Sequence, residues 1–218
     1  MSHRVVCVSL VTGAGSETIG RLVAASLGFR YVDDEIIALA AETAGLDRSI
    51  LESAEHDDFL ASLVDAILSR AVETVDSVSG GEAGDSPSAR KPPVAPPADE
   101  LRRLIERAII EIARRGQVVI VAHGASFALR GRPDTLRVHV VASQPTRIRR
   151  LSLGTKLVNE DEYVEMIAES DRQRAKYLAR FYDVPEELPT LYDLLINTDA
   201  LDLEQAAAAV IGAVTTAR

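Results

Sequence analysis

Short runs of apolar, mostly β-branched residues alternate along the chain with longer stretches in which apolar positions have helical spacing. Two short runs, 4–11 and 117–122, lack a strict alternation of apolar and polar residues, the pattern of strands buried on both faces. Residues 136–141 are another predicted strand. Two shorter strand candidates are 29–32 and 191–197. Apolar residues at i, i+3, i+4 and i+7 predict helices over 19–27, 35–44, 47–76, 99–115, 160–181 and 202–215, with a basic helix after Pro145. This alternation predicts an α/β fold with a mainly parallel sheet.

Residues with strong capping preferences support the ends of two predicted helices. Gly28 is placed to end the first helix, because glycine adopts the left-handed conformation of a C-cap without strain. Asp99 is a good N-cap for the helix that Gly116 ends.

The composition changes sharply over residues 77–98. This segment holds five of the nine prolines and three of the thirteen glycines, and it has no aromatic residue. Proline pairs cannot continue a helix or a central strand, so we predict a mobile loop. The strands beyond it are of the same kind as those before it. We therefore expect one domain over 1–218, with a helical insertion at 46–98 that ends in this loop.

Composition and charge narrow the class of protein. The net charge of −9 argues against a general nucleic-acid or anionic-membrane binder. Cys7 is the single cysteine, so an intramolecular disulfide and a cysteine-cluster metal site are excluded, and the four histidines lack zinc-ligand spacing. No apolar run approaches the roughly 20 residues of a membrane span, and the apolar start is too short for a signal peptide. We expect a cytoplasmic protein; self-association is left open.

A glycine-bearing turn joins the first predicted strand to the first predicted helix: Gly13, Ala14, Gly15, Ser16, Glu17 and Thr18. Backbone N–H groups of such a turn converge on a helix N-terminus, where the helix dipole favours an anion. The full phosphate-loop signature is GxxxxGK[ST], and this turn has no lysine. Two glycines at this place can also serve the backbone conformation alone.

Six segments in order resemble the cytidylate kinase-like family, a branch of the P-loop nucleoside monophosphate kinases. The run 8–24 is similar to the family's start, with its Gly-Ser-Gly-Gly-x-x-Ile-Gly segment. Residues 27–37 resemble the family's Asp-bearing segment after the second strand, and 118–125 resemble its strand ending in Gly-Arg-Gly-Ala. Residues 136–143 with 147–150 resemble its strand and basic helix. Residues 170–177 resemble its lid segment, and 192–198 its final Tyr-Asp-Leu segment. The resemblance covers nearly the whole chain except 46–98.

The resemblance implies a P-loop NTPase-type three-layer sandwich that transfers the γ-phosphoryl group of ATP, with Mg²⁺, to a nucleotide such as CMP. It implies that the turn from Gly13 to Thr18 wraps the phosphates and that the Thr18 hydroxyl meets the metal. Substrate-binding residues would be Asp33, His123, Gly124, Arg147, Arg150 and Arg172. The catalytic residues would be Arg174, in the lid segment, and Asp33.

Two departures from the family pattern favour an alternative. The P-loop lysine of the nucleoside monophosphate kinases aligns with Ser16, and His123 stands where the family has arginine. Strict alignment also places the metal-binding hydroxyl at Glu17, one position before Thr18. Since phosphoryl transfer depends on positive charge around the transferring group, a catalytically silent nucleotide-binding or scaffold protein is the second hypothesis.

Several of these residues have a purely structural alternative. Eight of the 24 lysines and arginines lie within 147–180, which indicates closure over a polyphosphate. The same residues can form a solvated helix face with the pairs Glu169–Arg172, Asp171–Arg174 and Glu169–Gln173. Asp33 and Asp34 can complement a helix dipole, and Asp33 is the better functional candidate.

Overall fold

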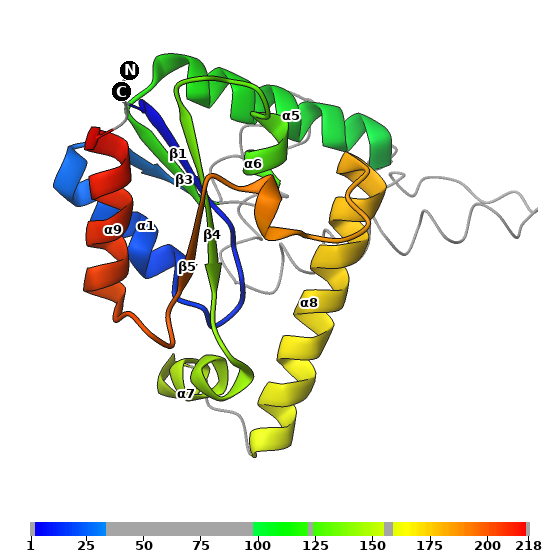
Figure 1. Cartoon of the computed structure of the whole chain (residues 1–218). Helices are drawn as coiled ribbons and strands as arrows, with labels where there is room; N and C mark the ends of the chain where they lie inside the picture. Colours follow the sequence, from blue (N-terminus) through cyan, green and yellow to red (C-terminus); the bar gives the residue numbers. More distant parts are fainter. Residues whose placement is uncertain (1–2, 34–97, 122–123, 155–158, 217–218) are drawn as a thin grey trace, which may run out of the picture. The chain divides into compact units, whose positions relative to one another are not determined.

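The computed structural model of the chain describes residues 3–33, 98–121, 124–154 and 159–216, with the backbone alone for 98–102 and 104 (Figure 1). Two compact units are distinguished: Met1–Ile36 with Ile109–Arg218, and Ile37–Ala108. Of the second unit, only 98–108 are described. Outside the described residues lie Asp34, His123, the predicted helices at 35–44 and 47–76, and the predicted loop at 77–98 except for its last residue, Ala98.

A five-stranded sheet forms the centre of the first unit. Its strands are β1 (Val5–Val8), β2 (Arg30–Val32), β3 (Val118–Val121), β4 (Thr135–Val141) and β5 (Leu194–Asn197). They lie in the order β2-β3-β1-β4-β5, and every neighbouring pair is parallel. All residues of β1 and β3 are buried, as their unbroken apolar runs predict. The predicted α/β class is confirmed.

The helices follow the predicted order closely. They are α1 (Ser16–Leu27), α5 (Ala98–Arg115), α6 (Ala125–Ala128), α7 (Gln144–Gly154), α8 (Glu160–Tyr182) and α9 (Leu203–Thr216), with a 3-10 turn at Pro189–Leu191. The predicted C-cap is confirmed, since Gly28 has φ 64°. The predicted N-cap is wrong by two residues: α5 begins at Ala98, so the N-cap position is 97 and Asp99 lies inside the helix. The short α6 and the 3-10 turn lack enough residues to show a period, and the pattern did not predict them.

Helices cover both faces of the sheet, which makes three layers. Alternate residues of β4 point to opposite faces. Val138 and Val140 belong to the core cluster that also holds Ile19 of α1 and Val210 of α9. His139, between them, instead contacts groups on the face covered by α8. Figure 1 shows α1 and α9 together on one side of the strands and α8 on the other.

The parallel strands end at one common edge, and β1 occupies its centre. The chain leaves β1 into α1 and returns at β2, on the far side of β3, whereas β4 lies on the other side of β1. Such a switch point is where open α/β sheets bind ligands. None of the helices in the described part of the chain combines the length and the hydropathy of a membrane span.

Candidate functional site

The segment between β1 and α1 forms a tight loop whose two glycines have left-handed backbones. The Ala14 N–H donates to the Val11 carbonyl at 3.0 Å, and Gly13, the third residue of this turn, has φ 75°. Gly15 has φ 91° and is the N-cap of α1. The first backbone bond of the helix runs from Ile19 N–H to Gly15 O at 3.0 Å, so the N–H groups before Ile19 have no partner within the helix. This is an anion-binding arrangement.

Both glycines also have a packing role, in addition to the conformational role that the structural alternative proposed. A Cβ at Gly13 would lie 2.9 Å from the Cβ of Arg147, and one at Gly15 would lie 2.5 Å from Cδ2 of Leu203. A larger residue at either position would disturb the packing before it met a ligand. Substitution of these glycines is therefore no clean test of phosphate binding.

Three arginines donate to carbonyl oxygens on the outside of the loop. Arg174 Nη1 donates to Leu10 O at 3.0 Å, and Arg147 Nε donates to Thr12 O at 2.6 Å. Arg150 Nη1 donates to Ala14 O at 3.1 Å and to Gly13 O at 3.4 Å. Because a trans peptide holds its C=O and N–H on opposite sides, these bonds turn the following N–H groups away from the guanidinium groups. The arginines thus orient the loop.

Ser16 stands at the lysine position of the phosphate-loop signature and is 2% exposed. Its hydroxyl accepts a long hydrogen bond, 3.4 Å, from the Val11 N–H. The side chain therefore faces the interior of the loop, and no flexible cation extends from this position. The next residues of the first helical turn, Glu17 and Thr18, are exposed.

Helix α8 is attached to the loop and to α7 through polar contacts. Both oxygens of Asp171 accept from the Arg147 guanidinium at 2.7 Å, and the Thr12 and Ser170 hydroxyls are 2.6 Å apart. The predicted Asp171–Arg174 pair is therefore wrong. Residues three positions apart on one helix face are neighbours, but Asp171 finds a better-oriented guanidinium on α7.

Arg174 is part of a buried polar cluster. Its Nε and Nη2 both donate to the Glu187 carboxylate, at 2.7 and 2.5 Å, and the Tyr192 hydroxyl donates to the same carboxylate. Burial alone would raise the pKa of Glu187, but the bonds from Arg174 and Tyr192 outweigh it, and the pKa of Glu187 lies below its ordinary value. The guanidinium therefore stays paired with a charged carboxylate.

His139 adjoins this cluster on β4. Its ring stacks on Tyr192 with centroids 4.6 Å apart, and its Nδ1 lies 2.8 Å from Ser9 Oγ. Ser9 Oγ already accepts from the Val140 N–H at 3.1 Å, so its own proton is available for Nδ1. This assignment places the imidazole proton on Nε2. Burial lowers the pKa of His139; Arg174 lowers it further, and Glu187 raises it in part.

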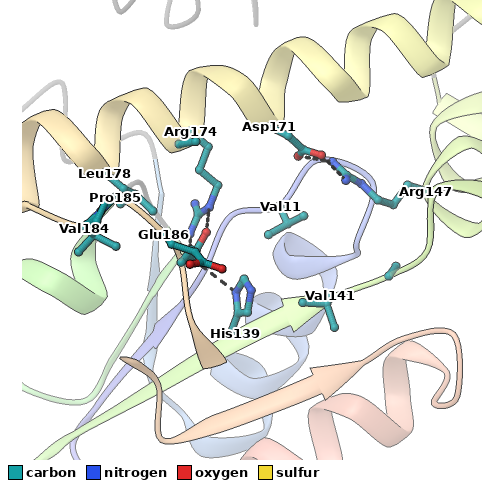
Figure 2. A pocket seen from close by; sticks show the side chains of 13 residues that line it. Val11, His139, Val141, Arg147, Asp171, Arg174, Leu178, Val184, Pro185 and Glu186 are labelled. Carbon is teal, nitrogen blue, oxygen red and sulfur yellow. Dashed lines mark hydrogen bonds and ion pairs between the residues drawn. The ribbon is translucent and has the colours of Figure 1, made fainter. Parts of the chain in front are cut away.

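A pocket of about 370 Å³ lies between β4, α8 and residues 184–187, with Val11 and Arg147 at the end next to the loop. Figure 2 shows Arg174 descending from α8 toward His139, and the Asp171–Arg147 pair across from it. Both arginines that line the pocket are paired with carboxylates. The pocket is therefore a cavity next to the loop, and the positive charges of the arginines that line it are neutralised by carboxylates.

The remaining predicted residues lie apart from this pocket. Asp33 follows β2, and its carboxylate accepts from Arg21 Nη2 at 3.1 Å; that guanidinium also stacks over Tyr31. Arg172 pairs with Glu169 on the exposed face of α8, as the structural alternative predicted, and Gln173 also bonds Glu169. Gly124, the N-cap of α6, is approached closely by the Tyr182 ring.

Sequence reasoning missed the cluster partners His139, Glu187 and Tyr192 as site residues. One signal was present: His139 is a titratable residue in the middle of a predicted strand, between the apolar Val138 and Val140. Glu187 carried no signal, because it lies in an irregular segment with other acidic residues. No group of three or more metal-ligating side chains occurs within the described ranges.

The comparisons agree with this architecture. The model of the cytidylate kinase-like family matches residues 5–200. An uncharacterised protein from Eubacterium ventriosum has a similar structure, with a TM-score of 0.66, 15% identity and 99% of each chain covered. Shikimate kinase from Bacteroides thetaiotaomicron has a TM-score of 0.53, 16% identity and 100% of each chain covered. A sugar kinase from Janibacter has a TM-score of 0.51 and 14% identity over 99% of this chain and 96% of its own. No curated protein matches the chain.

Proposed function

The chain belongs to the cytidylate kinase-like family, and on this premise we propose that it transfers the γ-phosphoryl group of ATP to a nucleotide such as CMP. Family and fold support a phosphotransferase of the P-loop kinase kind. The observation that carries the proposal is the loop between β1 and α1, residues 9–15. Three arginines donate hydrogen bonds to its carbonyl groups, and the first turn of α1, whose N–H groups have no partner within the helix, begins at its end.

The residues of the loop fit an anionic ligand. Gly13 and Gly15 allow a backbone course that other residues would strain, and the helix dipole adds partial positive charge. Thr18 and Glu17 are exposed oxygen-bearing side chains in the first turn, of the kind that Mg²⁺ prefers. Bound Mg²⁺-ATP would supply the phosphoryl group and neutralise part of its charge.

We place the acceptor near Asp33, His123 and Gly124, and assign Arg147, Arg150 and Arg172 to the binding of the phosphates and the nucleotide. Asp33 would orient the accepting hydroxyl, with Arg21 holding the carboxylate in place. Arg174 is proposed as the catalytic cation. To touch the transferring group it must exchange Glu187 for the phosphate, because all its nitrogens now donate to protein groups.

The silent nucleotide-binding alternative is favoured by one observation. The lysine position holds a serine that is buried and bonded inside the loop. Phosphoryl transfer depends on positive charge around the transferring group, and this site lacks the signature lysine and holds Arg174 paired with Glu187.

A coupled assay of ADP release decides between the two. Wild type is incubated with ATP, Mg²⁺ and each of a set of nucleoside monophosphates that includes CMP, and Ser16→Lys is tested beside it. We expect transfer by wild type and a higher rate for Ser16→Lys, since the lysine restores a cation within the loop. Ser16→Ala, which removes only the hydroxyl, is the control.

Two outcomes would reject the enzyme. If wild type transfers to no monophosphate and Ser16→Lys restores no transfer, while calorimetry shows nucleotide binding, the silent protein is the correct description. If wild type binds no nucleotide with or without Mg²⁺, both proposals fail.

A further inference from the structure

Arg150 contacts the loop differently from the other two arginines. Its Nη1 donates to the carbonyls of Gly13 and Ala14 and to Thr198 Oγ1, the last at 2.8 Å, while Nη2 donates to Thr198 O at 2.9 Å. All these acceptors are neutral. Thr198 Oγ1 in turn donates to Ala14 O at 3.0 Å, so this carbonyl receives two hydrogen bonds.

The other two guanidinium groups at the loop are neutralised by carboxylates. Arg147 is paired with Asp171, and Arg174 with Glu187. In the described part of the chain, no carboxylate lies within ion-pair distance of Arg150. The charge of Asp199 raises the pKa of Arg150, but the Asp199 carboxylate is itself bonded to the N–H and hydroxyl of Ser143. Burial and the neighbouring Arg149 lower the pKa of Arg150, which nevertheless stays protonated.

We propose that Arg150 supplies, from behind the loop, the fixed positive charge that a lysine supplies from within it in other P-loop proteins. Arg150 would act as a positioning residue for the ligand's phosphates, through the backbone and through space. This proposal rests on the proposed function, because it requires a polyphosphate at the loop.

The geometry allows this action across a single peptide group. Arg150 bonds the carbonyl of the Ala14–Gly15 peptide, and the N–H of the same peptide lies on the opposite side. Bond and hydrogen-bond lengths place a phosphate oxygen bound at that N–H roughly 8 Å from the guanidinium nitrogen. A unit charge at that distance changes anion affinity by about tenfold or more in a partly buried site. Donation to the carbonyl also polarises the N–H toward the ligand.

The test separates the effect of the positive charge of Arg150 from the effect of its packing and hydrogen bonds. Arg150→Gln keeps an amide donor and loses the charge, whereas Arg150→Lys keeps the charge. Arg149→Gln removes an exposed arginine from the adjacent position and serves as the matched control. Calorimetry measures binding of ATP and of inorganic tripolyphosphate at 50 and 300 mM NaCl, after thermal unfolding has shown that each variant is folded.

We expect Arg150→Gln to bind both ligands about tenfold more weakly or worse, Arg150→Lys to bind within about threefold of wild type, and Arg149→Gln to match wild type. The salt dependence of affinity should be smaller in Arg150→Gln than in wild type, since salt screens a charge interaction but does not alter packing. Thr198→Val removes a neutral bond to the same carbonyl and should leave the salt dependence unchanged.

Equal losses in the lysine and glutamine variants, with an unaltered salt dependence, would overturn the proposal and leave Arg150 a packing residue. That result would not affect the proposed function, since wild type would still bind and transfer. Conversely, an Arg150→Gln loss of affinity with no phosphoryl transfer by wild type would support this role and reject the enzyme. If wild type binds neither ATP nor tripolyphosphate, both proposals fail. Should Arg150→Gln not fold, the affinity and salt dependence of Arg150→Lys decide: values like those of wild type support the proposal.

Discussion

Three guanidinium groups meet one short loop, and each has a different set of partners. Arg147 and Arg174 each link a loop carbonyl to a carboxylate on another segment, whereas Arg150 bonds only neutral oxygens. Arginine therefore has two roles at this loop: Arg147 and Arg174 anchor it as neutralised ion pairs, whereas Arg150 keeps a positive charge next to it that is uncompensated within the described part of the chain. At this scale the paired groups determine stability, because a buried charge without its partner is costly.

Replacement of Arg174 should separate its contribution to stability from its proposed role in phosphoryl transfer. Arg174→Ala leaves the Glu187 carboxylate without its main partner, so we expect the free energy of unfolding to fall by about 3–5 kcal/mol. The double variant Arg174→Met with Glu187→Leu removes both charges and should recover much of that loss. Urea unfolding measures both, and the coupled assay shows whether the stable double variant still transfers phosphate. An Arg174→Ala protein as stable as wild type would contradict the anchoring role.

His139 should make stability depend on pH just below neutrality. Because burial lowers the pKa of His139 below its ordinary value of 6.5, the unfolded chain binds this proton more readily than the folded chain. Stability should therefore decrease as the pH falls from about 6.5 toward the lower folded pKa.

Thermal unfolding between pH 7.5 and 5 measures this dependence. His139→Gln cannot titrate and should show a flatter profile over this range. Identical profiles for wild type and His139→Gln would show that other groups control the dependence.

At the scale of elements, the effect of a glycine on stability depends on its place in a helix. At a helix end its left-handed backbone conformation matters, and inside a helix the entropy of the unfolded chain matters. Gly28 ends α1 at φ 64°, and a Cβ there would meet nothing within 4 Å. Gly212 lies inside α9, also with open space around a Cβ, but with a helical backbone. The two glycines thus differ in φ and not in crowding.

Alanine at these positions should have opposite effects. Gly28→Ala forces a side chain into the left-handed region and should lower the free energy of unfolding by about 1–2 kcal/mol. Gly212→Ala should raise it by about 0.5–1 kcal/mol, because alanine restricts the unfolded chain and favours the helix. Chemical denaturation of both variants is the measurement; a loss of stability in Gly212→Ala would mean that α9 needs the glycine for contacts beyond the described residues.

For the whole molecule, the proline-rich segment provides a direct test of domain organisation. Since α5 begins at Ala98, the segment to replace is 77–97. A short Gly-Ser linker in its place should keep thermal unfolding cooperative and Tm within about 4 °C, because the composition offers no apolar face to bury. A broad transition or a much lower Tm would show that the segment stabilises the fold.

The sequence located the glycine turn and named all three arginines at the loop, but it assigned their partners wrongly or not at all. Local spacing compares only residues on the same helix, and for that reason it paired Asp171 with Arg174. The observed partners are far apart in the chain: Arg147 bonds Thr12, Arg150 bonds Thr198, and Arg174 bonds Leu10. No periodic pattern contains these pairs.

By itself the sequence determined the type and order of the described strands and longer helices, the place of the turn between β1 and α1, and the family. These depend on properties local to the chain: apolar periodicity, the conformational freedom of glycine, and motif order. Only the tertiary structure decided that Ser16 is buried, that His139 joins a buried cluster, and that Arg150 lacks a carboxylate partner among the described residues. These depend on the strand order β2-β3-β1-β4-β5, which brings α7, α8 and the end of β5 against one loop, so that long-range hydrogen bonds and burial set the charge of the site.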